Sequence, residues 1–319
     1  MKIEGYEKRF VAFIDILGFK ALINSVESAT EESADFKRVK DILDFLHRES
    51  VESNGHHDLL VYEHVEDGLV ERELGDPRLS YISDCVIIST EGSFDGFKAI
   101  CNKITKLSVQ GASIGIYIRG AVTYGNVYHH GPMLFGTAYQ CAYGLEPQAV
   151  NPRVILDDVV FDVLKDNVGT FPLHESAIGT DSEGRKYLLN YPFNYISGYV
   201  TDWLSFLLRV KSSILYFLNK FDERVSGFGP ELKRLDQFCC WKELYGWNLN
   251  FDGGDSGVFR KYIWLKDEFN ATILKYSWYL EAGETAKKWP GGVQEGPRIL
   301  PIMWNGTHWG PEKELGHLR

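Results

Sequence analysis

The sequence has few cysteines and no long apolar run, and each of these absences argues against one class of protein. It contains five cysteines in 319 residues, an odd number, and no Cys-x-x-Cys pair. A disulfide framework or a structural zinc site is therefore disfavoured, and we expect reduced, buried thiols. No run of roughly 18 apolar residues occurs, and the first residues lack the apolar core of a signal peptide. We therefore expect no membrane association and a cytoplasmic location.

Basic residues are also scarce. Lys and Arg number 34 against 44 Asp and Glu, which gives a net charge of −10, and no lysine- or arginine-rich run is present. Proteins that bind nucleic acid usually present a basic face, so we expect no nucleic-acid partner. The 44% hydrophobic content indicates a globular protein with a substantial core.

An apolar strand that ends in an aspartate is the most informative feature present. Residues 10–14 are apolar, Asp15 follows, and the chain turns at Gly18 before a helical segment. This arrangement places a carboxylate at the end of a strand. It also leaves the turn N–H groups available for phosphate oxygens, and we assign that role to the residues Ile16, Leu17, Gly18 and Phe19. The alternative is an aspartate that caps a helix.

A second aspartate lies between two short apolar strands. Ser83-Asp84 interrupts the apolar segment 81–88. Asp15 and Asp84, each at the tip of a buried strand, would bind two divalent ions, Mg²⁺ or Mn²⁺, which prefer oxygen ligands. The alternative for Asp84 is an ordinary hairpin turn.

A third segment, residues 114–146, carries further motifs in a fixed order. A strand contains Arg119, Ala121 and Gly125, a hairpin follows, and Phe135-Gly136 begins a helix that reaches Glu146. The adjacent residues His129 and His130 in the hairpin would be poor joint metal ligands, because neighbouring side chains on a strand point to opposite faces.

Together these segments resemble the catalytic domain of class III nucleotidyl cyclases. The family pattern Phe-x-Asp-Ile-x-Gly-Phe is matched over 13–19, its second aspartate by Asp84, and its Phe-Gly helix start at 135–136. Its Arg-x-Gly-x-x-x-Gly strand is matched from Arg119, with Ala121 in place of the first glycine. The resemblance covers residues 8 to about 165 and implies metal ligands at Asp15, Ile16 and Asp84.

The departures from the family pattern concern the substrate. The helix positions of the ribose-binding asparagine and the transition-state arginine hold Gln140 and Gly144. Ser80 and Met133 occupy the two positions that select adenine, and with Tyr81 they would line the base pocket. Ordinary packing is the alternative role for these three. Arg119 either pairs with a carboxylate or supplies the missing transition-state charge.

Within the superfamily the sequence is most similar to the pyrimidine cyclases of bacterial Pycsar antiphage systems. This resemblance implies a homodimer that shares its active sites, with Asp15 and Asp84 from one subunit and the helix bearing Gln140 from the other. It further implies conversion of UTP or CTP to a cyclic monophosphate that activates a separate effector. We prefer UTP, although no residue distinguishes O4 from N4. The alternatives are a non-catalytic nucleotide-binding module and a purine cyclase with a rebuilt base pocket.

The expected fold is α+β. We predict a ferredoxin-like palm over residues 1–170, with an antiparallel sheet covered by helices. A mostly helical, aromatic-rich extension would occupy 171–319 and pack on the palm. The predicted segments are strands at 9–15, 113–124, 126–130, 153–156 and 186–192, a turn-rich stretch at 51–77, and helices at 19–27, 31–50, 93–108, from 137, from 157, and at 200–224, 230–245 and 257–281.

Overall fold

The computed structural model describes residues 5–27, 34–51, 60–65, 68–165, 178–188, 203–222, 256–275, 302–304 and 309–311. Contacts divide the chain into two compact units, Met1–Ala112 with Ile116–Tyr199, and Ser113–Gly115 with Val200–Arg319. We call these the first and the second unit. The first unit thus extends beyond the predicted boundary at residue 170, because strands at 178–188 belong to its sheet.

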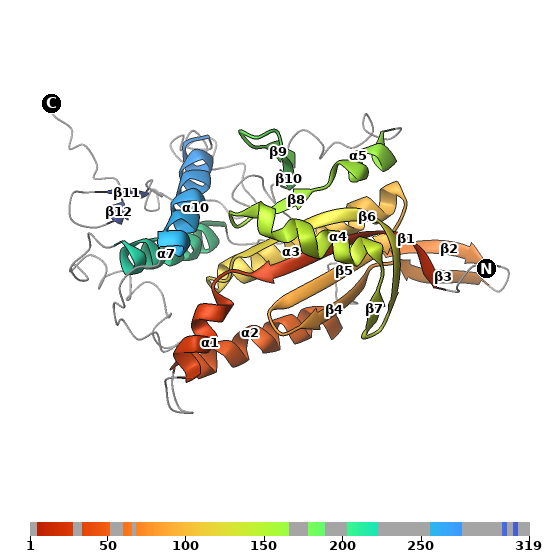
Figure 1. Cartoon of the computed structure of the whole chain (residues 1–319), viewed down its shortest axis with the longest axis horizontal. Coiled ribbons are helices and arrows are strands. Elements are labelled where there is room, and N and C mark those ends of the chain that lie inside the picture. The colour runs from red at the N-terminus through yellow and green to blue at the C-terminus, as the bar shows by residue number, and fades with distance from the viewer. Residues whose placement is uncertain are drawn as a thin grey trace. The chain divides into compact units, whose positions relative to one another are not determined.

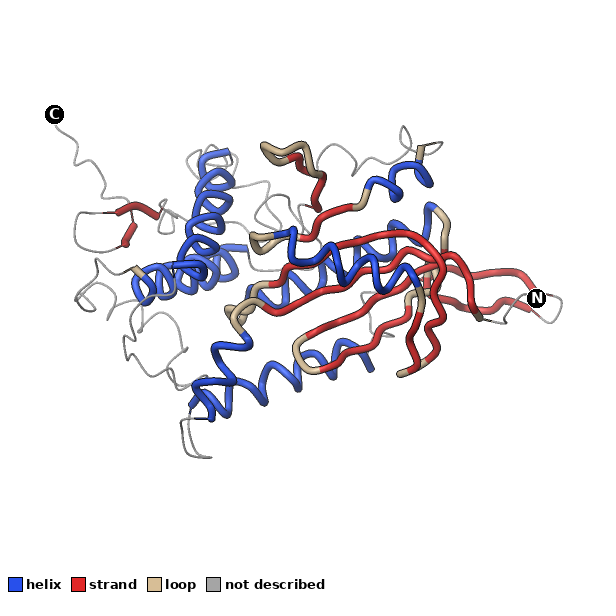
Figure 2. The backbone as a smooth tube through the Cα atoms, in the orientation of Figure 1, coloured by secondary structure: helices blue, strands red, loops and turns tan. Residues whose placement is uncertain are grey.

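The first unit is an eight-stranded sheet covered by helices, the predicted α+β fold (Figures 1 and 2). The strand order is β4-β5-β1-β6-β8-β10-β9, and β7 pairs with β6. Pairing is antiparallel except between β6 and β8, which run parallel. The order β4-β5-β1-β6 with antiparallel neighbours is the predicted palm. The strands are β1 (Tyr6–Ile16), β4 (Arg78–Ile82), β5 (Cys85–Glu91), β6 (Ile118–His130), β7 (Met133–Phe135), β8 (Val154–Leu156), β9 (Ile178–Thr180) and β10 (Lys186–Leu188).

Helices cover both faces of this sheet because strand β1 is apolar on both sides. The Phe10 ring packs against Phe97 of α3 on one face, with 5.6 Å between ring centroids. Phe13 packs with Ala138 and Ala142 of α4 on the other face, and Figure 1 shows α3 and α4 on opposite sides of the sheet. The helices of this unit are α1 (Phe19–Glu27), α2 (Ala34–Val51), α3 (Phe94–Ser113), α4 (Thr137–Leu145), the 3₁₀ helix η1 (Glu146–Ala149) and α5 (Asp158–Leu164).

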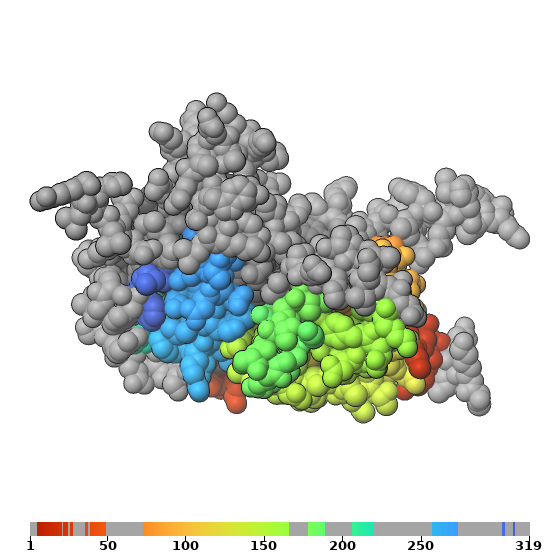
Figure 3. Space-filling view, turned by 90° about the horizontal axis from the view of Figure 1, so that it is seen from above, coloured from red at the N-terminus to blue at the C-terminus, as the bar shows by residue number. Residues whose placement is uncertain are grey.

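Two local predictions were wrong. The stretch 51–77 contains a hairpin, β2 (Leu60–Val65) and β3 (Gly68–Glu73), where we expected only turns. The strands expected at 113–124 and 126–130 are one continuous strand, β6, because β1 pairs with it along 11 residues. Figure 3 shows the β9–β10 hairpin (green) on the surface beside the preceding α4–α5 region (yellow-green).

The described part of the second unit contains two helices and a short hairpin. Helices α7 (Trp203–Phe221) and α10 (Ser256–Lys275) contact each other, and the rings of Phe217 and Tyr262 stack at 4.4 Å. Strands β11 (Ile302–Trp304) and β12 (Trp309–Pro311) form a hairpin that packs beside these helices. The buried Trp309 donates a hydrogen bond from Nε1 to Asp222, directly after α7, at 2.8 Å. Of the aromatic side chains described here, Phe206, Tyr262, Phe269 and Trp309 are buried. The helix expected at 230–245 lies outside the described residues. None of the described helices has the length and apolar character required to span a membrane.

Candidate active site

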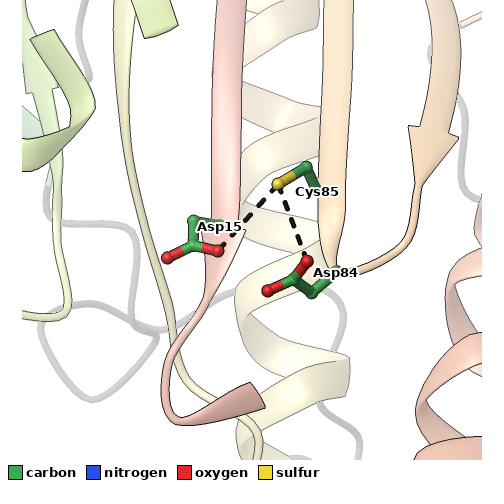
Figure 4. Close-up of side chains that lie close together, drawn as sticks. All are labelled: Asp15, Asp84 and Cys85. Carbon is green, nitrogen blue, oxygen red and sulfur yellow. Dashed lines mark hydrogen bonds between the residues drawn. The ribbon is translucent and has the colours of Figure 1, made fainter. Parts of the chain in front are cut away.

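Strand pairing brings the two predicted aspartates together at one end of the palm. Asp15 lies next to the last residue of β1 and pairs with Cys85 of β5. Asp84 lies in the turn between β4 and β5, where Ser83 has a φ of 57°. The Ile16 N–H donates to the Asp84 carbonyl at 3.2 Å and fastens this turn to the end of β1. One ligand atom from each of Asp15, Asp84 and Cys85 lies within 4.8 Å of the others (Figure 4).

Cys85 is a member of this group that sequence analysis did not predict. Its Sγ lies 4.0 Å from Asp15 Oδ1 and 3.9 Å from Asp84 Oδ1, as weak thiol hydrogen bonds. Burial, followed by the charges of Asp84 and Asp15, raises the pKa of the thiol to about 12. The thiol is therefore protonated at neutral pH and acts as a donor to the carboxylates. The sequence feature that could have indicated Cys85 is its position directly after Asp84, at the start of the strand that pairs with β1.

The site carries more carboxylates than neutralising charge. The Arg119 Nε donates to Asp15 Oδ2 at 3.1 Å and also forms an ion pair with Glu146, which is 6% exposed. Burial raises the pKa of Asp15 to about 6. Glu146 and Asp84 add to this rise, and Arg119 opposes it. The guanidinium of Arg119 thus pairs with two of the three neighbouring carboxylates, and a cation at this position would be stabilised.

Glu146 was also missed, because the end of a predicted helix is usually exposed. Arg119, in contrast, was expected either to pair with a carboxylate or to stabilise the transition state. The structure shows the pairing, and the transition-state role remains a prediction.

The group of atoms fits a hard divalent cation. Its charged donors are the carboxylate oxygens of Asp15 and Asp84, which Mg²⁺ and Mn²⁺ prefer as ligands. Asp15 and Asp84 are therefore the residues that would hold the metal, with Ile16 beside them.

The predicted phosphate-binding turn needs a correction. The N–H of Ile16 donates to Asp84 and that of Leu17 donates to Tyr117 at 2.8 Å, so both groups are already engaged. Gly18, with a φ of 83°, and Phe19 begin helix α1, whose first N–H groups have no acceptor within the helix. Only the second half of the turn is therefore available for phosphate.

The three predicted base-pocket residues do not all lie together. Tyr81 faces helix α2, where its hydroxyl lies 2.9 Å from His47 Nδ1. Ser80, its neighbour on β4, points to the opposite face and donates to the Gly131 carbonyl at 2.8 Å. Gly131 lies in the β6–β7 hairpin that also carries Met133, which is 55% exposed. The structure thus groups Ser80 with the hairpin of Met133 and removes Tyr81 from the pocket.

Gln140 and Gly144 lie on the exposed side of helix α4. The opposite side buries Ala138 and Ala142 on the sheet. Cys141 is exposed as well, which contradicts the expectation that the cysteines are buried; within the described residues Cys85, Cys101 and Cys141 are free thiols. Gln140 therefore faces outward, in a position to meet a second molecule.

Comparison with known proteins gives matches to solved structures only. No family model and no curated protein matches the chain. The monomeric guanylyl cyclase domain of the RhoGC fusion protein from the aquatic fungus Blastocladiella emersonii is 14% identical. The match covers 58% of this chain and 95% of that one, with a TM-score of 0.34. The adenylyl cyclase CyaB from P. aeruginosa is 16% identical, with 57% and 92% covered and a TM-score of 0.33. The guanylyl cyclase Cya2 is 13% identical, with 51% and 82% covered and a TM-score of 0.32. Similarity at this level supports no conclusion about activity.

Proposed function

We propose that this protein is a nucleotidyl cyclase that acts on a pyrimidine nucleoside triphosphate. The observation that carries the proposal is the convergence of Asp15 and Asp84 from two strand ends, with ligand atoms within 4.8 Å. Both aspartates occur in segments that resemble the metal-binding motifs of class III cyclases. In the reaction, the ribose 3′-oxygen bonds to the α-phosphorus, the bond to the β-phosphate oxygen breaks, and diphosphate leaves with the hydroxyl proton passing to solvent.

Each part of the site has a role in this reaction. Asp15, Asp84 and the Ile16 carbonyl would hold two divalent ions, which when bound neutralise triphosphate charge and favour ionisation of the 3′-hydroxyl. The N–H groups of Gly18 and Phe19 would bind phosphate oxygens at the start of α1. Arg119, already beside Asp15, would stabilise charge on the α-phosphate.

A second copy of the chain would complete the site. Gln140 is exposed on α4 and would contact the ribose bound to the partner. The cyclic pyrimidine nucleotide would act on a separate effector in antiphage defence, which the sequence resemblance implies. UTP is the substrate that sequence analysis prefers, although no sequence motif distinguishes O4 of uracil from N4 of cytosine.

One observation favours a second candidate, a nucleotide-binding module without turnover. Gly144 stands where ordinary cyclases have their transition-state arginine, and no atom lies within 4 Å of the position that its Cβ would occupy. Among the described residues, therefore, no group from another element stands at that point of the helix in place of the guanidinium. A purine cyclase is less well supported, because Ser80 and Met133 lack the charge pattern that selects adenine.

The test is incubation of the full chain with UTP, CTP, ATP or GTP and Mn²⁺, with products identified by mass spectrometry. We expect a cyclic pyrimidine nucleotide and a loss of at least about 100-fold in rate in Asp15→Ala and in Asp84→Ala. Ser108→Ala, which removes a buried hydroxyl that donates to the Ile104 carbonyl within α3, is the control and should keep full activity. No cyclic product from any triphosphate, with nucleotide-dependent thermal stabilisation retained, would establish the binding module instead.

A further inference from the structure

A chain of hydrogen bonds runs beneath the proposed base pocket. Arg9 Nε lies 3.2 Å from Ser89 Oγ, and Ser89 Oγ lies 2.8 Å from His129 Nδ1. His129 Nε2 then lies 2.9 Å from Ser80 Oγ, and Ser80 Oγ lies 2.8 Å from the Gly131 carbonyl oxygen. Sequence analysis assigned no role to Arg9, Ser89 or His129, and the His129 side chain is buried, with 1% of its surface exposed.

The carbonyl end of this chain and a neutral imidazole together fix the direction of its bonds. A guanidinium only donates, so Ser89 Oγ accepts from Arg9, and its own proton is available for His129 Nδ1. A carbonyl oxygen only accepts, so the single proton of Ser80 goes to Gly131. His129 must then donate from Nε2 to Ser80.

His129 is neutral in this arrangement. Burial, followed by the charges of Arg9 and Arg78, lowers the pKa of His129 to about 4, and the charge of Asp76 opposes this only in part. The ring therefore holds one proton, on Nε2, across the physiological range.

The Ser80 hydroxyl thus directs its proton to the Gly131 carbonyl and keeps one lone pair that accepts no hydrogen bond from the bonds described. Its oxygen donates once, to Gly131, and accepts once, from His129. A hydroxyl oxygen has two acceptor positions, so one remains for a ligand. Ser80 is partly exposed and can present it.

The position of Ser80 relative to the aspartates suits the far end of a nucleotide. Ser80 pairs with Ile87 of β5, and Ile87 pairs with Phe13 of β1, two residues before Asp15. Cross-strand partners share a face, so Ser80 and Asp15 lie on the same side of the sheet. Two strand spacings and two residues separate their Cα atoms by about 12 Å. A nucleotide with its α-phosphate at Asp15 would therefore reach Ser80 with the C4 side of its base.

We propose that Ser80 selects a base with an exocyclic amino group, so that the pyrimidine substrate is CTP rather than UTP. The inference rests on the proposed function. The free lone pair of Ser80 accepts from the N4 amino group of cytosine, whereas O4 of uracil would place two acceptors against each other. The fixed proton relay from Arg9 prevents the hydroxyl from turning to donate. This reverses the preference for UTP drawn from the sequence.

The experiment measures kcat/KM for CTP and for UTP, with Mn²⁺, in the full chain. We expect at least about 10-fold preference for CTP in the wild type, because a mismatched buried polar pair costs more than one tenfold step. In Ser80→Ala the ratio should fall to within about threefold of unity, mainly through slower CTP turnover. Ser89→Ala keeps Ser80 but frees His129 to take its other tautomer, and should reduce the ratio as well. Ser108→Ala is the matched control and should keep the wild-type ratio.

The outcomes separate this inference from the proposed function. Equal turnover of both substrates, or faster turnover of UTP, would overturn the inference and leave the cyclase proposal intact. If no cyclic product forms at all, the cyclase proposal fails, and thermal stabilisation by CTP or UTP with Mn²⁺ decides the base. A larger shift with CTP that disappears in Ser80→Ala would sustain the role of Ser80, and equal shifts would refute it.

Discussion

At the scale of single residues, the charge on Asp15 is the property with the clearest consequence. Its carboxylate is partly buried beside Asp84 and Glu146, and only Arg119 offsets them. The folded protein therefore stabilises the protonated form relative to the unfolded chain. A bound cation would reverse this preference, because it favours the ionised form.

This predicts opposite effects of Asp15→Asn with and without metal. The pKa of Asp15 is raised from 3.8 to about 6 on folding. The cost of ionising it in the folded state is absent below pH 3.8, grows between pH 3.8 and about 6, and is constant above. In EDTA at pH 8, Asp15→Asn should therefore be more stable than the wild type by up to about 3 kcal/mol, and at pH 4 by no more than about 0.6 kcal/mol.

Thermal unfolding at the two pH values measures the difference, and Mn²⁺ at pH 8 should stabilise the wild type but not Asp15→Asn. A wild type that is more stable than Asp15→Asn in EDTA at pH 8 would contradict the prediction. Asp157→Asn is a suitable comparison, because Asp157 is also a carboxylate at a strand end but lies outside the site and accepts from Thr123.

At the scale of elements, two glycines of the helix α4 region should respond in opposite directions to the same substitution. Gly136 begins α4 with a φ of 149°, and a Cβ there would lie 2.5 Å from the Asn126 carbonyl oxygen. Gly136→Ala should cost about 2–4 kcal/mol because neither strand backbone nor helix start can move freely. Gly144 lies within the helix with no neighbour in reach, so Gly144→Ala should stabilise by about 0.5–1 kcal/mol. Urea unfolding of both variants checks the signs, and a neutral Gly136→Ala would show that the helix start is not constrained.

Sequence patterns were sufficient for the palm because each element there has its own local signal. The apolar run before Asp15 and the Phe-Gly start of α4 were both confirmed. The hairpin β2–β3 was missed because its apolar residues occur in short runs, Leu60–Tyr62 and Leu69–Val70, that charged residues follow. Among the described residues, each of its strands pairs only with the other. The β9–β10 hairpin was missed as part of the sheet because its pairing with β8 is a contact between distant segments.

The site was predicted less fully, for a related reason. Asp15 and Asp84 were found because each ends a strand, but Glu146 and Cys85 enter the site through packing around Arg119 and β1. The direction of the Ser80 hydroxyl depends on Arg9, 71 positions away in the sequence, through a chain of bonds that no motif records. Polarity of this kind can only be assigned from the folded arrangement.

At the scale of the whole molecule, the first unit presents apolar side chains that a monomer would leave in water. They lie on the elements that build the site, at the end of β4, on β7, on α4 and after η1. Tyr143 contacts the Phe13 ring at 5.2 Å yet is 59% exposed. These exposed side chains are Ile82, Met133, Phe135, Tyr143 and Val150. Exposed apolar residues on the elements that build the candidate site favour a partner surface, and the proposed partner is a second copy of the chain.

A shared site predicts that two inactive variants should restore each other. Asp84→Ala removes a metal ligand, and Gln140→Ala removes the proposed ribose contact that comes from the partner. In a mixed dimer, one of the two sites then contains both defects and the other contains neither. When the two variants are mixed in equal amounts, half of the dimers are mixed, and each mixed dimer has one intact site of two. About a quarter of wild-type activity should therefore return.

Mixing Asp84→Ala with Asp15→Ala is the control and should restore nothing, because both residues belong to the same subunit's half of each site. Recovery in neither mixture, with dimers present by light scattering, would place Gln140 outside the partner's site and require each chain to supply a complete one.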